Sequence, residues 1–161
     1  MKYSDFKKAI DKPYFSVQDI RLRGLIVYPY QLTLWKRESL LASFKRGWYY
    51  FPEKKKYLTP EVISKALYSP SYISSEFALR VYGCIPEMVY TCTSLTSKTT
   101  RKFSNEFGMF SYRHIRPEVF CGYHVVREGE LTYTLADPEK ALLDLIYLRL
   151  DMRSEEDIAS L

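Results

Sequence analysis

Long apolar runs and a secretory signal are both missing from this chain of 161 residues. No apolar run approaches the ~20 residues that a membrane-spanning helix needs. The polar, lysine-rich start of the chain lacks the apolar segment of a signal peptide. We therefore expect a cytoplasmic protein with no membrane partner.

Cysteine and glycine are scarce, and their placement argues against several kinds of site. Cys84, Cys92 and Cys121 are an odd number without a C-x-x-C pair, which indicates reduced thiols rather than disulfides or a paired zinc motif. The six glycines stand singly, so no glycine-rich loop is available to hold a phosphate. No nucleophile elbow is present, and the acids within residues 137–139 suit a helix cap better than a metal. We expect no catalytic residues, no metal and no cofactor, and hence no enzyme.

Aromatic residues and positive charge are what the chain has in quantity. It contains 15 Tyr, 9 Phe and 2 Trp, and 47% of its residues are apolar, which is enough to build a core. Residues 1–58 carry 13 Lys and Arg against five Asp and Glu, a net charge of +8, whereas residues 59–161 have a net charge of −3. This asymmetry predicts one module that meets a polyanion and a second with another role.

Residues 28–51 combine a helical pattern with a hairpin pattern. Tyr28, Leu32 and Trp35 are spaced as one buried face of a helix that begins at Pro29. Aromatic and branched residues flank the basic turn at residues 45–47, which predicts a two-stranded hairpin.

Two shorter helices are expected before this pattern, over residues 4–11 and residues 17–23. Ser16 is a good N-cap for the second helix, and Gly24 ends it. Helix, helix, turn, helix and hairpin is the order of a winged helix-turn-helix, in which the third helix enters the DNA major groove. We therefore predict a winged helix domain over residues 1–52 that binds double-stranded DNA.

The side chains of this domain that could reach DNA lie on the outer side of the third helix, at the end of the second helix and at the hairpin tip. Hydroxyls, amides and cations can donate to base edges or phosphates. The predicted DNA-binding residues are Arg21, Arg23, Tyr30, Gln31, Thr33, Lys36, Arg37, Lys45 and Arg46. An ordinary amphipathic helix with its polar face in water would give the same pattern, and Leu34 on the outer face fits either interpretation poorly.

A basic linker over residues 53–58 is predicted to lead into a second domain over residues 59–161. In that domain we expect helices over residues 59–68 and 73–83, then an antiparallel sheet with an apolar helix from Pro138 buried against it. The expected strands cover residues 89–96, 109–115, 120–127 and 131–135. The fold class is thus α+β, a winged helix-turn-helix followed by an antiparallel-sheet-plus-helices domain.

The run from Thr91 to Arg101 is the best candidate for a functional surface of the second domain. Its seven hydroxyls and following cations suit phosphate or RNA contacts. A solvent-facing strand explains the run equally well, because Thr is a good strand former. The predicted polar surface consists of Thr96, Lys98, Thr99, Arg101 and Lys102.

Several blocks of the chain resemble the AbiEi-type antitoxins of type IV toxin–antitoxin systems, which act in phage resistance. The blocks are residues 72–79, 93–101, 110–115 and 138–144, and the stretch 35–49 is also similar. The resemblance covers roughly residues 5–150. It implies an autorepressor whose winged helix binds inverted repeats upstream of its own operon. It also implies that the second domain counteracts a co-encoded nucleotidyltransferase toxin, an action that is thought not to need a stable complex.

The chain departs from the family pattern between the third helix and the hairpin, where members usually carry Gly and this chain has Ser39. Because positive φ is uncommon outside Gly, we expect either that Ser39 adopts other angles or that the hairpin is set differently. A helix that begins at Ser154, close to the last residue, suggests a chain cut short of its natural end. The alternative function is a winged-helix regulator whose second domain senses a ligand or protein partner, and a third class is an enzyme acting on nucleic acid.

Overall fold

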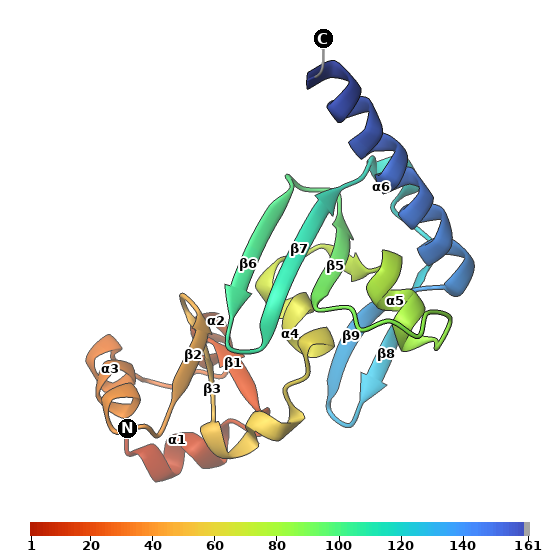
Figure 1. Cartoon of the computed structure of the whole chain (residues 1–161). Coiled ribbons are helices and arrows are strands. Elements are labelled where there is room, and N and C mark those ends of the chain that lie inside the picture. The colour runs from red at the N-terminus through yellow and green to blue at the C-terminus, as the bar shows by residue number, and fades with distance from the viewer. Residues whose placement is uncertain (160–161) are drawn as a thin grey trace. The chain divides into compact units, whose positions relative to one another are not determined.

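The computed structural model describes the backbone of residues 1–159 and the side chains of residues 1–151. The fold contains both helices and strands, so the predicted α+β class is confirmed. The chain divides into two compact units (Figure 1): unit 1 covers Met1–Thr59, and unit 2 begins at Pro60.

Unit 1 combines three short helices with a small antiparallel sheet of order β1-β3-β2. Its elements are α1 (Tyr3–Ala9), β1 (Tyr14–Ser16), α2 (Val17–Leu22), α3 (Pro29–Arg37), β2 (Ala42–Lys45), β3 (Trp48–Tyr50) and the 3-10 helix η1 (Pro52–Tyr57). The three helices and the hairpin were predicted. Strand β1 was not, because three residues are too few to show a period of two.

Aromatic side chains fill the core of unit 1. The Phe6 ring lies 5.3 Å from Phe15, 4.9 Å from Trp35 and 6.4 Å from Phe51, measured between ring centroids. Helix α3 buries Trp35 and Leu32 in this core, as predicted.

The predicted burial of Tyr28 was wrong, since its side chain is 54% exposed and stacks on Tyr30. Tyr28 is the N-cap of α3 and has an extended backbone, so the helical spacing does not extend to it.

Capping interactions define where the helices of unit 1 begin and end. Ser16 and Asp19 form a reciprocal capping box at the start of α2. At the end of α3, the N–H of Ser39 donates to the Lys36 carbonyl at 3.0 Å, and the N–H of Leu40 donates to the Trp35 carbonyl at 2.9 Å. These two bonds form a Schellman motif, which requires a left-handed residue. Ser39 takes that conformation itself, with φ of +59°, so the expectation that it adopts other angles was wrong.

The segment predicted as a basic linker, residues 53–58, is instead part of unit 1. It forms most of η1, and Leu58 at its end is buried. Lys54 donates to the Asp11 carbonyl at 2.9 Å, and Glu53 forms an ion pair with Lys7 at 2.8 Å. A run of lysines in a sequence is typical of a solvated linker, but here these contacts attach the segment to the rest of unit 1.

Unit 2 is a six-stranded sheet with helices on both faces. Its elements are α4 (Pro60–Leu67), β4 (Ser71–Ile73), α5 (Ser75–Val81), β5 (Thr91–Thr96), β6 (Arg101–Asn105), β7 (Gly108–His114), the 3-10 helix η2 (Pro117–Val119), β8 (Tyr123–Glu128), β9 (Leu131–Ala136) and α6 (Pro138–Ala159). Tyr112 on β7 donates to the Ser64 carbonyl of α4 on one face. Tyr72 on β4 donates to Asp144 of α6 on the opposite face.

The sheet of unit 2 is mixed, which corrects the prediction of an antiparallel sheet. The strand order is β6-β7-β5-β4-β9-β8, and the pairs β5/β7 and β4/β9 are parallel. The hairpin of β6 and β7 folds back so that β7 enters between β6 and β5, which forces the parallel pairing (Figure 1). We missed β4 because Ile73 fits the helical spacing of α5, although that helix begins only at Ser75.

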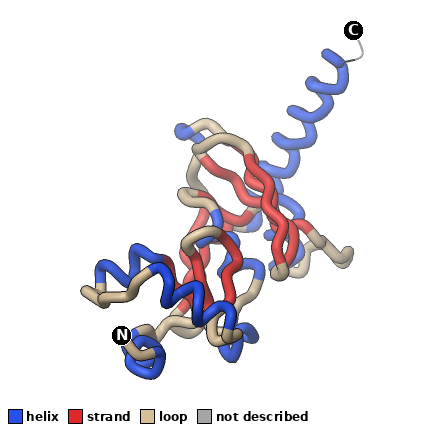
Figure 2. Tube along the Cα trace, turned by 90° about the vertical axis from the view of Figure 1, so that its left-hand side faces the viewer, coloured by secondary structure: helices blue, strands red, loops and turns tan. Residues whose placement is uncertain are grey.

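Helix α6 differs from the prediction in two ways. Its backbone continues through Ser154 to Ala159, where we expected a new helix, and its end runs past the strands (Figure 2). The side chain of Ser154 lies outside the described residues. The helix was predicted to bury its apolar residues against the sheet, and Ala141 and Leu148 are buried, but Leu142 and Ile146 are 50% and 49% exposed.

Candidate nucleic-acid interface

The outer side of α3 carries the side chains that were predicted to meet DNA. Tyr30, Thr33, Leu34 and Arg37 line one shallow hollow on unit 1. Tyr30 is 67% exposed, and Thr33 and Arg37 are also exposed. Burial of Leu32 and Trp35 fixes the rotation of the helix, so these four residues face outward together.

The hairpin tip and the end of α2 add exposed cations to the same unit. Gly47 has φ of +79°, the left-handed conformation that the tight turn between β2 and β3 requires. Arg46 beside it is exposed, and Lys45 is half-buried. Arg21, in the last turn of α2, is exposed as well.

Three of the predicted DNA-binding residues already make hydrogen bonds within unit 1. The Gln31 amide donates to the Met1 carbonyl at 2.8 Å and accepts from the N–H of Tyr28 at 3.0 Å. Arg23 donates to the Ala9 carbonyl at 2.7 Å, and Thr33 donates to its own helix at the Pro29 carbonyl. Local spacing could not reveal the bonds from Gln31 to Met1 and from Arg23 to Ala9, because these partners lie 30 and 14 positions away in the chain.

Two of the acids in unit 1 have partners that reduce their effect on the surrounding potential. Both the backbone N–H and the hydroxyl of Ser16 donate to Asp19 at 2.7 Å. Glu53 pairs with Lys7. Lys36 and Arg37 at the end of α3 are exposed, and the exposed carboxylate of Glu38 follows them. The balance of charge around α3 therefore favours an anionic partner.

Four of the five residues predicted to form a polar surface of unit 2 are exposed. Thr96 is buried and donates to the Pro70 carbonyl at 2.7 Å, so its assignment to the surface was wrong. Its side chain lies on the face of β5 that α4 covers, where hydroxyl-rich sequence gives no sign of burial. Lys98 and Arg101 both lie over the ring of Tyr68, at 5.5 and 5.4 Å from its centroid. Thr99 and Lys102 are exposed nearby in the chain.

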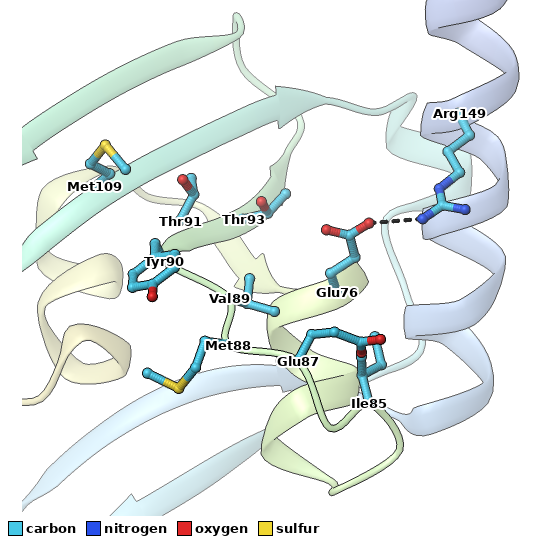
Figure 3. Close-up of a pocket in the computed structure, with 10 residues that line it drawn as sticks. All are labelled: Glu76, Ile85, Glu87, Met88, Val89, Tyr90, Thr91, Thr93, Met109 and Arg149. Carbon is cyan, nitrogen blue, oxygen red and sulfur yellow. Dashed lines mark hydrogen bonds and ion pairs between the residues drawn. The ribbon is translucent and has the colours of Figure 1, made fainter.

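Unit 2 also contains a groove that sequence reasoning missed (Figure 3). It measures about 660 Å³ and lies where β5 and β7 begin, beside the segment that leads from α5 to β5. Glu76 and Arg149 form an ion pair of 2.9 Å on one side of it. Met88 and Tyr90, which are 71% and 75% exposed, come from the connecting segment. The sequence feature that could have indicated this groove is the group of apolar residues in the segment between α5 and β5.

Among the described residues, no three His, Cys, Asp or Glu side chains gather closely enough to hold a metal ion. No helix in the described part of the chain is both long and apolar enough to cross a bilayer. Comparison with models of known protein families gives no match, and comparison with curated proteins gives none either.

Proposed function

We propose that unit 1 is a winged helix that binds duplex DNA in a sequence-specific manner. The observation that carries the proposal is the outward face of α3, where Tyr30, Thr33 and Arg37 are exposed together on the most basic part of the chain. The order α1-β1-α2-α3-β2-β3 supports it, because a helix presented beside a basic hairpin suits the major groove and its backbone.

We further propose that the protein represses its own operon and counteracts a co-encoded nucleotidyltransferase toxin. This part rests on the resemblance of its sequence blocks to AbiEi-type antitoxins. The DNA partner would be an inverted repeat upstream of the gene. Unit 2 would carry the antitoxin role, with the surface around Lys98, Arg101 and Lys102 as its most basic part.

Substitutions of Arg37 and Arg46 distinguish recognition of the DNA bases from attraction to the DNA backbone. If Arg37 contacts a base, Arg37→Ala weakens binding to the preferred duplex by about 1–3 kcal/mol and leaves binding to other sequences nearly unchanged. Arg46→Ala weakens binding to all duplexes alike and reduces the slope of log K against log salt by about 1, because one phosphate contact is lost. Fluorescence anisotropy with labelled duplexes at several salt concentrations measures both effects.

Arg127 provides the matched control for these variants, because it is an exposed arginine on β8 in unit 2. Arg127→Ala should leave affinity, discrimination and salt slope unchanged. If Arg37→Ala, Arg46→Ala and Arg127→Ala have equal effects, only general positive charge attracts DNA, and the proposed reading surface is wrong.

The groove in Figure 3 favours a second candidate function, a DNA-binding regulator whose second domain senses a ligand. Its volume falls in the range of small-molecule sites, ~300–1,000 Å³. The neighbouring gene distinguishes the two functions. A nucleotidyltransferase toxin that stops growth when expressed alone, and is relieved by this protein, supports the antitoxin. No relief supports the sensor.

A further inference from the structure

Helix α6 has an apolar face on the side that points away from the sheet. It consists of Leu142, Leu143, Ile146, Tyr147 and Leu150, whose side chains are 46% to 63% exposed. At 100° per residue these five positions occupy one side of the helix. Ala141, Asp144 and Leu148 occupy the other side and are buried against unit 2. We call the five exposed residues the outer α6 face.

A helix that is buried on one side and apolar on the opposite, exposed side is typical of a helix packed between two layers. Five side chains of this exposure present roughly 500 Å² of apolar surface, near the upper end of the largest patch on a typical monomer. Leu143 and Tyr147 at the edge of the face share a hollow with Val119. Most of the face is nevertheless open to solvent, so burying it would release considerable free energy.

Three of the charged residues of α6 that lie near the outer α6 face have partners in the same subunit. Arg149 pairs with Glu76 at 2.9 Å, Asp151 lies 3.7 Å from Arg113, and Lys140 pairs with the buried Asp144 at 2.8 Å. The face itself carries no charge. An uncharged apolar face suits an equally apolar surface better than it suits a nucleic acid.

We propose that the outer α6 face binds the same face of a second copy of this chain, with the two helices antiparallel. A two-fold axis between Ile146 and Tyr147 brings Leu143 opposite Leu150 of the partner subunit. The same axis brings Ile146 opposite Tyr147 of the partner subunit. Each contact is thus repeated by symmetry, as a closed dimer interface requires. Leu143, Ile146, Tyr147 and Leu150 are spaced i, i+3, i+4 and i+7, the seam along which paired helices pack.

The available area is near the lower limit for a specific dimer. About 500 Å² of apolar surface per copy amounts to about 1,000 Å² in total before the surrounding rim is counted, compared with ~1,200–2,000 Å² for a standard specific interface. The dimer does not depend on DNA binding, so each proposal can fail without the other. If both hold, a dimer offers two copies of unit 1, which is the number that an inverted repeat needs.

Sedimentation equilibrium of the full chain tests the dimer. We expect a monomer–dimer equilibrium for the natural sequence. Leu150→Glu should raise the dissociation constant by about 100-fold or more, because it introduces two charges into the apolar seam. Val125→Glu is the matched control, since Val125 lies on β8 in the same unit with 61% exposure, close to the 60% of Leu150. It should leave the equilibrium unchanged. Circular dichroism confirms that both variants remain folded.

Disulfide trapping tests the antiparallel register. The exposed Cys84 and Cys121 are first replaced by Ser, and Leu143→Cys and Leu150→Cys are then made separately. An oxidised mixture of the two variants should form a covalent dimer. Each variant alone should not, because identical positions lie about 10 Å apart along antiparallel helices, beyond disulfide reach. A monomer at every concentration, or trapping of each variant only with itself, overturns the proposal.

Discussion

At the scale of single residues, the buried Asp144 joins three polar partners in unit 2. Its carboxylate accepts from the Ser74 hydroxyl at 2.7 Å and the Tyr72 hydroxyl at 3.0 Å, and it pairs with Lys140 at 2.8 Å. These bonds attach α6 to β4 and to the start of α5. The sequence offered no sign of them, because Asp144 lies more than 70 positions from Tyr72 and Ser74 would pass for a simple cap.

Asp144→Ala should lower the free energy of unfolding by about 3–5 kcal/mol, because it leaves buried donors and a lysine without their acceptor. Asp151→Ala, on the same helix, removes a partly exposed ion pair with Arg113, whose loss should cost less than about 1 kcal/mol. Urea unfolding followed by circular dichroism compares the two. Equal losses would show that the buried network contributes no more than a surface pair.

The three cysteines differ in burial, which predicts their reactivity. Burial raises the pKa of the Cys92 thiol to about 12, whereas Cys84 and Cys121 are exposed. A thiol reagent at pH 8 should therefore modify two cysteines in the folded protein and the third only after denaturation. Rapid reaction of all three would contradict the burial of Cys92.

The buried thiol also gives stability a dependence on pH. The pKa of Cys92 is higher in the folded chain than in the unfolded chain, so its contribution is complete below about pH 9 and is lost as pH rises towards 12. Burial raises the pKa of Tyr72 and Tyr112 in the same direction. The thermal midpoint should therefore fall steadily above pH 9, and Cys92→Ala should reduce part of that fall. A flat profile from pH 9 to pH 11 would contradict this expectation.

At the scale of elements, α3 is followed by a non-glycine residue whose backbone takes a strained, left-handed conformation. Ser39 holds the left-handed conformation that closes the Schellman motif before β2. Ser39→Gly should stabilise unit 1 by about 0.5–1 kcal/mol, because Gly adopts positive φ without a steric penalty. Ser4→Gly, at an exposed site inside α1, should destabilise by a similar amount. Thermal unfolding of both variants measures the difference, and destabilisation by Ser39→Gly would contradict the assigned conformation.

Helices and hairpins with strong local signals were predictable, while elements defined by distant partners were not. Local chemistry was enough to predict α2, α3 and the β2–β3 hairpin, from Ser16, Pro29 and the turn at Gly47. Strands β1 and β4 have three residues each and exist because neighbouring strands supply their hydrogen bonds. The parallel pairing of β5 with β7 likewise depends on how the chain returns, which periodicity does not encode.

The candidate site shows the same division. Spacing identified Tyr30, Thr33 and Arg37 as one outward face of α3, and the structure brings them to one hollow. Spacing did not reveal that Gln31 is held by the Met1 carbonyl. It also missed the groove of unit 2, whose lining comes from several separate elements.

At the scale of the whole molecule, the division of charge matches the division into units. Unit 1 has a net charge of +8, while the rest of the chain has a net charge of −3. A polyanion should therefore associate through unit 1, and raising the salt concentration should weaken that association steeply. Unit 2 contributes a groove and the outer α6 face, which suit contacts of other kinds.

The most direct measurement compares the dissociation constants for two duplexes of equal length and composition at the same salt concentration. One carries the DNA upstream of the gene, including its inverted repeat, and the other carries the same bases scrambled. We expect the upstream duplex to bind at least ~10³-fold more tightly, the lower limit for specific recognition. Equal dissociation constants would contradict a sequence-reading role for α3.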